Sequence, residues 1–235
     1  MANLKEYRDN ELKWFLAANI LLMLISSNII FGRDNNELTS WIENLGKIID
    51  IAIFSVTSYV FTFVLDSIIP SRIKTLLLFL WKKQPSCTIF TQIQKKCEDD
   101  RFTAADAPKQ YHAIYLKLQQ EDKPFSDQTP LWYRIYNKHR DNAIVFGSNK
   151  DYLLLRDLYA QTIVLLIVYI MLLLLTGIVV FSRSYFVYLL IAIAALNIAA
   201  RNQGRRMVYN VLAVDINARK TVTLQRRKAN DKTDL

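Results

Sequence analysis

One stretch of the sequence limits the fold more than any other. Residues 158–181 contain no charged side chain over 24 positions. A helix of that length, rising about 1.5 Å per residue, exceeds the hydrocarbon thickness of a bilayer, which is roughly 30 Å. A helix in water would instead spread its apolar residues along one face at a period of about 3.6 residues. The sequence therefore predicts a membrane-spanning helix here.

Three further apolar blocks predict three further spans, at residues 14–31, 48–69 and 185–200. The last block is short, but Arg183 and Arg201 flank it, and their long side chains reach the two membrane interfaces. A cleavable signal peptide is the alternative for the first block. No small-x-small cleavage site follows that block, and its flank mixes acidic with basic residues, which favours a retained span.

The distribution of basic residues predicts the orientation of these spans. Of the 30 Lys and Arg residues, 27 fall in segments 1–13, 70–157 and 201–235, and 3 fall in connectors 32–47 and 182–184. Because cytoplasmic loops hold the excess of positive charge, both termini and the middle region are predicted to be cytoplasmic. This topology explains the net charge of +9 before any affinity for nucleic acid does.

These predictions together give a mainly α fold. It is a four-helix transmembrane bundle of two hairpins, with a small, mostly helical cytoplasmic domain inserted between the second and third spans. Within that domain, residues 73–81 are predicted to lie along the inner membrane surface. The segments in chain order are the cytoplasmic N-terminus 1–13, the first span 14–31, the external loop 32–47, the second span 48–69, the cytoplasmic domain 70–157, the third span 158–181, the external turn 182–184, the fourth span 185–200 and the cytoplasmic C-terminal segment 201–235.

The cytoplasmic region carries several helix signals. Residues 109–121 have an apolar stripe at i, i+3, i+4 and i+7, which predicts an amphipathic helix. Pro130 suits the first turn of a second helix. Ser148 or Asn149 is the predicted cap of a helix that continues into the third span. Residues 208–216 are apolar enough to pack on this domain. The apolar stripe of residues 109–121 consists of Tyr111, Ile114, Tyr115 and Leu118.

Polar residues follow one face of the second predicted span. They recur at steps of three, four and four residues, which keeps them within about 80° of one another around a helix. In hydrocarbon such a stripe either packs against another helix or lines a wet pore, and the sequence leaves both alternatives open. Packing is favoured, although a carboxylate at the cytoplasmic end suits a pore mouth or an ion pair with Arg72 or Lys74. The stripe consists of Ser55, Ser58, Thr62 and Asp66.

Aromatic and basic residues mark a second candidate surface on the cytoplasmic side. Interleaved rings and cations could contact a partner or an anionic surface such as a nucleic acid. A packed amphipathic helix under the membrane is the favoured explanation of residues 132–140, and anionic lipid head groups are the favoured partner of the arginines after the fourth span. The candidates are Trp132, Tyr133, Arg134, Tyr136, Lys138, Arg140, Arg201, Arg205 and Arg206.

Nothing in the sequence predicts catalysis, a cofactor or a metal site. There is no glycine-rich phosphate loop, nucleophile elbow, His-Glu-x-x-His motif or pair of intramembrane acids. His112 and His139 have no ligand at metal spacing. Cys87 and Cys97 are predicted to be free thiols, because both lie in the cytoplasmic region. The chain is therefore predicted not to be an enzyme.

Three segments carry a resemblance to a known group of proteins: residues 132–136, residues 152–157 leading into the third span, and residues 201–207. With this architecture, the chain resembles small four-pass membrane subunits and effectors of bacterial anti-phage defence systems. The resemblance implies a multi-pass protein of the bacterial inner membrane, surrounded by lipid, that forms a homo-oligomer and binds a cytoplasmic protein partner. It implies either an effector that perturbs membrane permeability or, as the alternative, a non-conducting anchor that stations its partner at the membrane. A nucleic-acid contact is not favoured.

Overall fold

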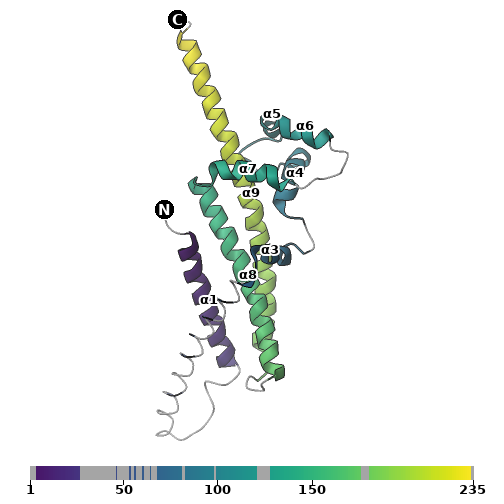
Figure 1. Cartoon of the computed structure of the whole chain (residues 1–235), viewed down its shortest axis with the longest axis vertical. Coiled ribbons are helices and arrows are strands. Elements are labelled where there is room, and N and C mark those ends of the chain that lie inside the picture. The colour runs from purple at the N-terminus through teal and green to yellow at the C-terminus, as the bar shows by residue number, and fades with distance from the viewer. Residues whose placement is uncertain are drawn as a thin grey trace. The chain divides into compact units, whose positions relative to one another are not determined.

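A computed structural model describes residues 4–26, 46, 53, 56, 60, 64, 68–80, 83–97, 99–120, 128–175 and 180–233. This part of the chain is mainly helical and contains no strand, which confirms the mainly α prediction. The helices, shown in Figure 1, are α1 (Leu4–Ser26), α3 (Ser71–Leu78), the 3-10 helix η1 (Pro85–Cys87), α4 (Ile89–Lys95), α5 (Asp106–Gln110), α6 (His112–Gln120), α7 (Thr129–His139), α8 (Ala143–Leu175) and α9 (Arg183–Thr233).

The chain divides into two compact units. The first unit comprises Met1–Leu78 and Leu153–Ala200, and the second comprises Phe79–Tyr152 and Arg201–Leu235. Helices α8 and α9 each belong partly to the first unit and partly to the second: α8 is divided after Tyr152, and α9 after Ala200. Each unit has an apolar core of its own.

In the first unit, side chains of α1, α8 and α9 form one apolar core. The rings of Tyr169 and Tyr185 meet edge to face, with 5.0 Å between their centroids. The Tyr185 hydroxyl donates to the backbone oxygen of Asn19 at 3.3 Å, and the backbone N–H of Ser182 donates to the Tyr169 hydroxyl at 2.8 Å. These bonds fix the start of α9 against both other helices. The buried core residues are Leu16, Ile20, Met23, Leu24, Leu165, Tyr169, Tyr185 and Leu189.

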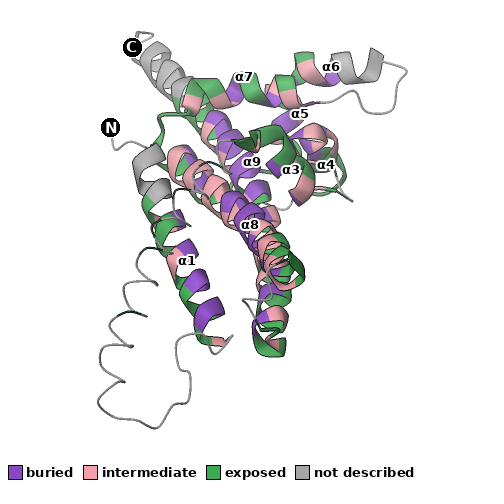
Figure 2. Cartoon of the chain, turned by 60° about the horizontal axis from the view of Figure 1, so that its bottom comes forward, coloured by how far each residue is buried: buried purple, intermediate pink, exposed green. Residues whose placement is uncertain are grey.

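Two helices of the described chain are long and apolar enough to cross a membrane. They occupy Ala143–Leu175 and Arg183–Thr221. Only 33% and 17% of the residues in their most apolar windows are buried within the chain, whereas the core helix of a soluble protein is buried on most sides. Figure 2 shows exposed residues, in green, along both helices. The chain is thus consistent with membrane association.

Two candidate spans are fewer than the four predicted. The first predicted span, 14–31, is described only as far as Ser26, at the end of α1. The second, 48–69, lies almost entirely outside the described residues. The third begins inside α8, and the fourth lies inside α9. The number of spans therefore stays a prediction.

A buried ion cluster links α3 to α8 within the first unit. The Nζ atom of Lys74 lies 3.8 Å from Oδ1 of Asp157, and Arg156 donates to the same oxygen through Nε at 2.9 Å and Nη2 at 2.8 Å. All three side chains are buried. The start of the segment 73–81, predicted to lie on the membrane surface, belongs to α3. The exposed apolar residues of α3 are Ile73 and Leu76.

In the second unit, the predicted helix over 109–121 is divided. Helix α5 ends at Gln110 and α6 begins at His112, because Tyr111 between them has φ −110° and ψ 31°. Tyr111 and Tyr115 are nevertheless both buried, as the apolar stripe predicted. The stripe identified the buried face but not the break at Tyr111.

The starts of α7 and α8 agree with the sequence to different degrees. Pro130 lies in the first turn of α7, as predicted. Helix α8 begins before the predicted cap residues Ser148 and Asn149, because the side chain of Asn142 accepts a hydrogen bond from the backbone N–H of Ile144 at 3.0 Å. One uninterrupted helix then runs to Leu175, which confirms the predicted continuation of this helix into the third apolar block.

The core of the second unit packs around the middle of α9. The prediction that residues 208–216 pack on the middle of the chain is confirmed. Burying each large apolar side chain stabilises the unit by roughly 1.5–3 kcal/mol. The α9 residues in this core are Met207, Val208, Tyr209, Val211, Leu212, Ala213 and Ile216. Their buried neighbours include Ile89, Phe90, Ile93, Phe102, Tyr111, Tyr115, Trp132, Ile135 and Val145.

Gln128 ties α7 to α4 in this core. Its side-chain Oε1 accepts a hydrogen bond from the backbone N–H of Phe90 at 2.9 Å, and its Nε2 donates to the hydroxyl of Thr91. The N-cap residue of α4, Thr88, makes no side-chain bond to the helix. Gln128 therefore supplies an acceptor that the first turn of α4 would otherwise lack.

Asp215 of α9 joins three elements of the second unit. Its Oδ2 accepts a hydrogen bond from the Tyr111 hydroxyl at 2.8 Å and lies 3.3 Å from Nη2 of Arg219. Its Oδ1 lies 2.8 Å from Nε2 of His139, at the end of α7. The Asp215 side chain is only 4% exposed. Burial, and then the neighbouring carboxylate, raise the pKa of Tyr111, so its hydroxyl stays a donor.

Asp215→Ala removes a buried acceptor and leaves the Tyr111 hydroxyl and the His139 ring without it. We expect the free energy of unfolding of the second unit to fall by about 3–5 kcal/mol. Thermal unfolding of the full chain in detergent, followed by circular dichroism, measures the effect. The control is Asp141→Ala, since Asp141 is 63% exposed and lies 3.7 Å from Arg140. This control should change stability by about 0.5 kcal/mol or less. Equal effects of the two substitutions would contradict the role of Asp215.

Asp106 holds the start of α5. Its Oδ2 accepts hydrogen bonds from the backbone N–H of Thr103 at 2.8 Å, from the Thr103 hydroxyl at 3.0 Å and from Nζ of Lys220 at 2.9 Å. The Thr103 backbone bond, with the Lys220 bond next, lowers the pKa of Asp106 to about 2. The ionised carboxylate therefore connects the α4–α5 loop to α9.

This lowered pKa predicts a pH dependence of stability. The pKa of Asp106 in the unfolded chain is about 3.9, so its contribution is fully present above about pH 4 and is lost as the pH falls through about 2. In Asp106→Asn, melting temperatures measured across this range should fall less steeply than in the wild type. Lys220→Ala keeps the Thr103 bonds and should retain part of the slope. An unchanged slope in Asp106→Asn would refute this assignment.

Candidate functional site

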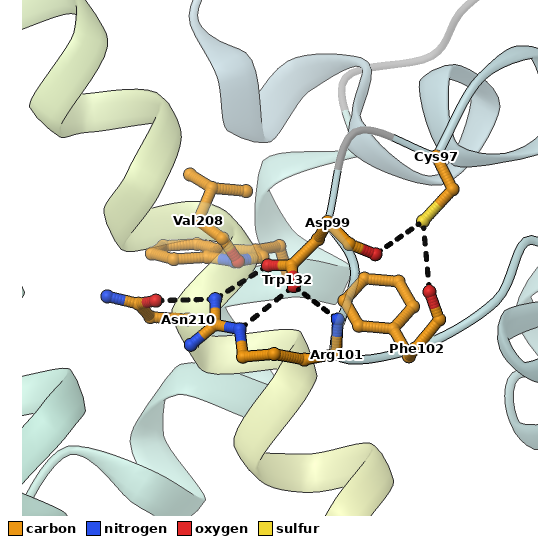
Figure 3. Close-up of polar contacts among 7 residues, drawn as sticks. All are labelled: Cys97, Asp99, Arg101, Phe102, Trp132, Val208 and Asn210. Atoms are coloured by element: carbon orange, nitrogen blue, oxygen red, sulfur yellow. Dashed lines mark hydrogen bonds and ion pairs between the residues drawn. The ribbon is translucent and has the colours of Figure 1, made fainter.

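The predicted contact residues on α7 separate into buried and exposed groups. Trp132 is buried, and its Nε1 donates to the backbone oxygen of Val208 at 3.3 Å (Figure 3). Its ring stacks on that of Tyr136 with 5.5 Å between centroids, and the Tyr136 hydroxyl accepts from Nδ2 of Asn149 at 3.1 Å. Trp132 and Tyr136 therefore serve packing within the second unit. The exposed residues are Tyr133, Arg134, Lys138 and Arg140.

The three arginines on α9 differ in their surroundings. Arg201 is half-buried, whereas Arg205 and Arg206 are exposed. Adjacent residues point about 100° apart on a helix, so Arg205 and Arg206 face different sides. Of the three, Arg206 lines a cavity that described residues of the second unit form. The predicted stripe of the second span, Ser55, Ser58, Thr62 and Asp66, lies outside the described residues.

That cavity has a volume of about 700 Å³ and is formed by three parts of the second unit. Residues 99–101, in the loop between α4 and α5, form one wall. The first turns of α8 form another, through Ala143, Ile144, Gly147, Ser148 and Asp151. Helix α9 forms the third, through Gln203, Arg206 and Asn210. The lining is mainly polar, with a small apolar area on α8.

Hydrogen bonds between these walls fix the cavity at two places. Arg101 forms a two-pronged ion pair with Asp99, at 2.8 and 2.6 Å, and its Nη2 also donates to Oδ1 of Asn210 at 2.6 Å (Figure 3). The Arg101 hydrogen bond lowers the pKa of Asp99. Elsewhere, Nε2 of Gln203 donates to Asp151 at 3.3 Å. The loop is thereby attached to α9, and α9 to α8.

Cys97 organises the loop that carries the first wall. Its thiol donates to the backbone oxygens of Asp99 at 3.5 Å and Phe102 at 3.4 Å, as Figure 3 shows. The Phe102 ring is buried and stacks on Tyr209 of α9 with 6.3 Å between centroids. Both Cys87 and Cys97 are free cysteines. The thiol of Cys97 thus acts as a local hydrogen-bond donor.

Two glycines of the second unit have opposite surroundings. A Cβ atom at Gly204 would lie 3.0 and 3.2 Å from two ring carbons of Tyr152, so any larger residue there would force the Tyr152 ring to move, and glycine favours the close packing of α9 on α8. A Cβ atom at Gly147 would meet nothing within 4 Å. Gly147 lines the cavity, so the absence of its side chain keeps this part of the α8 wall open.

The cavity offers charged groups but no metal site. Its lining contains three aspartates and two arginines. Arg206 has no ion pair within 4.0 Å among the residues that the structure describes. Within the same residues, no group of three or more His, Cys, Asp or Glu side chains could hold a metal ion. The cavity therefore suits recognition of a charged group rather than metal chemistry.

The cavity could not be found from the sequence, because its lining comes from three separated segments. Only two signals were present. Arg206 was a candidate contact residue, and Gly147 is a glycine inside a helix, where alanine would be more stable. Asp215 and Gln128 were also missed, since a lone acidic or amide residue in a helical segment is usually solvated.

Substitutions on α7 should separate packing from surface residues. Trp132→Ala removes a buried ring and a buried donor, and we expect it to lower the free energy of unfolding by about 3–5 kcal/mol. Tyr133→Ala, at a side chain that is 50% exposed, should cost about 1 kcal/mol or less. Chemical unfolding of the full chain in detergent, monitored by tryptophan fluorescence and circular dichroism, compares the two. Comparable losses would place Tyr133 in the core as well.

Comparison of the chain with protein-family models, with curated proteins and with solved structures finds no match. The resemblance to anti-phage membrane subunits stays a prediction.

Proposed function

We propose that the chain is a non-enzymatic, multi-pass membrane subunit that forms a homo-oligomer and binds a cytoplasmic protein partner. One observation carries the membrane assignment: many apolar side chains of α8 and α9 in the first unit are exposed. Leu174 is 79% exposed, and Ile191 is 63% exposed. Water disfavours such surfaces, whereas lipid or a second copy of the helix covers them.

Four spans remain the proposed topology. In α1, Leu21, Leu22 and Ile25 are exposed, as expected of a third lipid-facing helix. In the second predicted span, all described residues but one are apolar and exposed, and Ile69 is half-buried. The exposed ones are Ile53, Val56, Val60, Val64 and Ile68.

The position of the polar stripe in this span supports a role inside the bundle. Ser55 and Thr62 each follow an exposed residue, Ile53 and Val60, by two positions. Two positions correspond to about 200° on an α-helix. The spacing alone, on an ideal α-helix, favours a stripe directed away from these isoleucines and valines, as expected of residues that pack against other helices or line a pore.

The proposed biological role is that of an effector or sensor subunit in bacterial anti-phage defence, at the inner membrane with both termini in the cytoplasm. The alternative is a non-conducting anchor that holds its partner at the membrane. Both roles use the second unit as the cytoplasmic module, and its separate core supports this use. They differ in whether the stripe conducts ions.

Membrane potential distinguishes the two roles. In cells that express the chain with its copurifying partner, a voltage-sensitive dye should report loss of potential after phage infection. Asp66→Ala and Thr62→Leu should reduce that ion leak roughly severalfold, because they remove hydrated groups from the stripe. Membrane insertion of both variants is checked by fractionation. Full potential during effective protection would reject the effector and favour the anchor.

A further inference from the structure

We propose that the cavity of the second unit is a docking pocket for an acidic side chain of the partner protein, whose carboxylate binds Arg206. This proposal rests on the proposed function for the existence of a protein partner. It adds the site of binding, the kind of side chain that is bound and the residues that recognise it.

The hydrogen bonds that fix the cavity place Arg206 between them. On α9, Arg206 lies one turn from Gln203, which bonds to Asp151, and one turn from Asn210, which bonds to Arg101. On α8, Gly147 lies one turn before Asp151. Arg206 and Gly147 therefore occupy the middle of the two helical walls.

Arg206 provides an unmatched cation at this central position. Its side chain is exposed, and no carboxylate among the described residues lies within 4.0 Å of it. The other arginine of the lining, Arg101, is already held by Asp99 and Asn210. A guanidinium presents a planar set of N–H donors that matches a carboxylate through two parallel hydrogen bonds.

Gly147 leaves room for the incoming side chain. Glycine weakens a helix interior relative to alanine, and the surroundings of Gly147 do not demand it, in contrast to Gly204. The neighbouring floor is apolar, formed by Ala143 and by Ile144, which is 54% exposed. The methylene groups of a glutamate can lie on this floor while the carboxylate reaches Arg206.

The net charge of the lining opposes a phosphate more strongly than a carboxylate. Three aspartates face two arginines, which gives the lining a net charge of −1. A phosphate group carries a charge of about −1.5 to −2 and would meet these aspartates. A carboxylate brings a single charge, and a basic residue beside it on the partner would match Asp100 and Asp151. The predicted partner segment therefore carries an acidic residue next to apolar and basic ones.

Selection of peptides tests the pocket without knowledge of the natural partner. The full chain in lipid nanodiscs is presented with a phage-displayed library of short random peptides, and the chain carrying Gly147→Phe serves for counter-selection. We expect the recovered peptides to share an acidic residue flanked by apolar residues. Replacing that residue by its amide, or Arg206 by Ala, should weaken binding by about tenfold or more.

Matched variants separate the pocket from general charge effects. Arg205→Ala removes a neighbouring arginine outside the cavity lining and should leave peptide binding unchanged. Arg206→Lys keeps the charge but loses the two-pronged geometry, so it should bind with intermediate affinity. Circular dichroism of Gly147→Phe confirms folding, since this position has space for a side chain.

Several results would overturn the proposal. They are the recovery of no peptide that depends on both Gly147 and Arg206, equal binding of the acidic and amide peptides, or displacement of the peptides by millimolar phosphate. Failure of the proposed function gives a different result. If the chain binds acidic peptides but has no protein partner in cells, the docking pocket is supported and the proposed function is rejected. If a partner copurifies equally with the wild type and with Gly147→Phe, the proposed function is supported and the docking pocket is rejected.

Discussion

Burial of the stretch Met207–Ile216 of α9, on nearly all of its sides, is the constraint on which the second unit depends. Between Met207 and Ile216, every residue except Asn210 and Val214 is buried, and Asn210 is occupied by Arg101. Helices α4 to α7 are short, from 5 to 11 residues, and helices of this length are marginal in water when isolated. They persist because their apolar sides are covered by the same stretch of α9. The side-chain bonds of Trp132 and Tyr111 then fix their orientation.

Polar groups in this core are tolerated because nearly all of them are matched. Asp215 would be costly to bury alone, but it has a hydroxyl, an imidazole and a guanidinium as partners. Gln128 is buried with both ends of its amide bonded. These contacts are directional, so they specify one arrangement of α4, α7 and α9 where apolar packing alone would accept several.

The sequence predicted features that depend on composition or on short-range period. Helical class, the long apolar stretch of α8, Pro130 at the start of α7 and the buried side of Tyr111 and Tyr115 all follow from such patterns. Features that depend on the tertiary environment of one residue were not predictable. The break at Tyr111 places its hydroxyl on Asp215, which is 104 residues away along the chain, and no local pattern records that bond. The cavity escaped detection for the same reason, since its walls meet only in the folded chain.

Functional surfaces are expected where charged residues lack a partner within the fold and where a glycine has no packing reason. Asp99, Asp106 and Asp215 each have a cation within the second unit, and Gly204 has a packing reason to be glycine. Arg206 and Gly147 have neither a matching charge nor a packing reason among the described residues, yet both line the same cavity. An exposed arginine without an ion pair is solvated and costs the fold little, whereas a glycine inside a helix weakens it slightly. Neither residue adds to the stability of the described chain, and both become favourable once an acidic side chain enters, so together they argue for an external ligand.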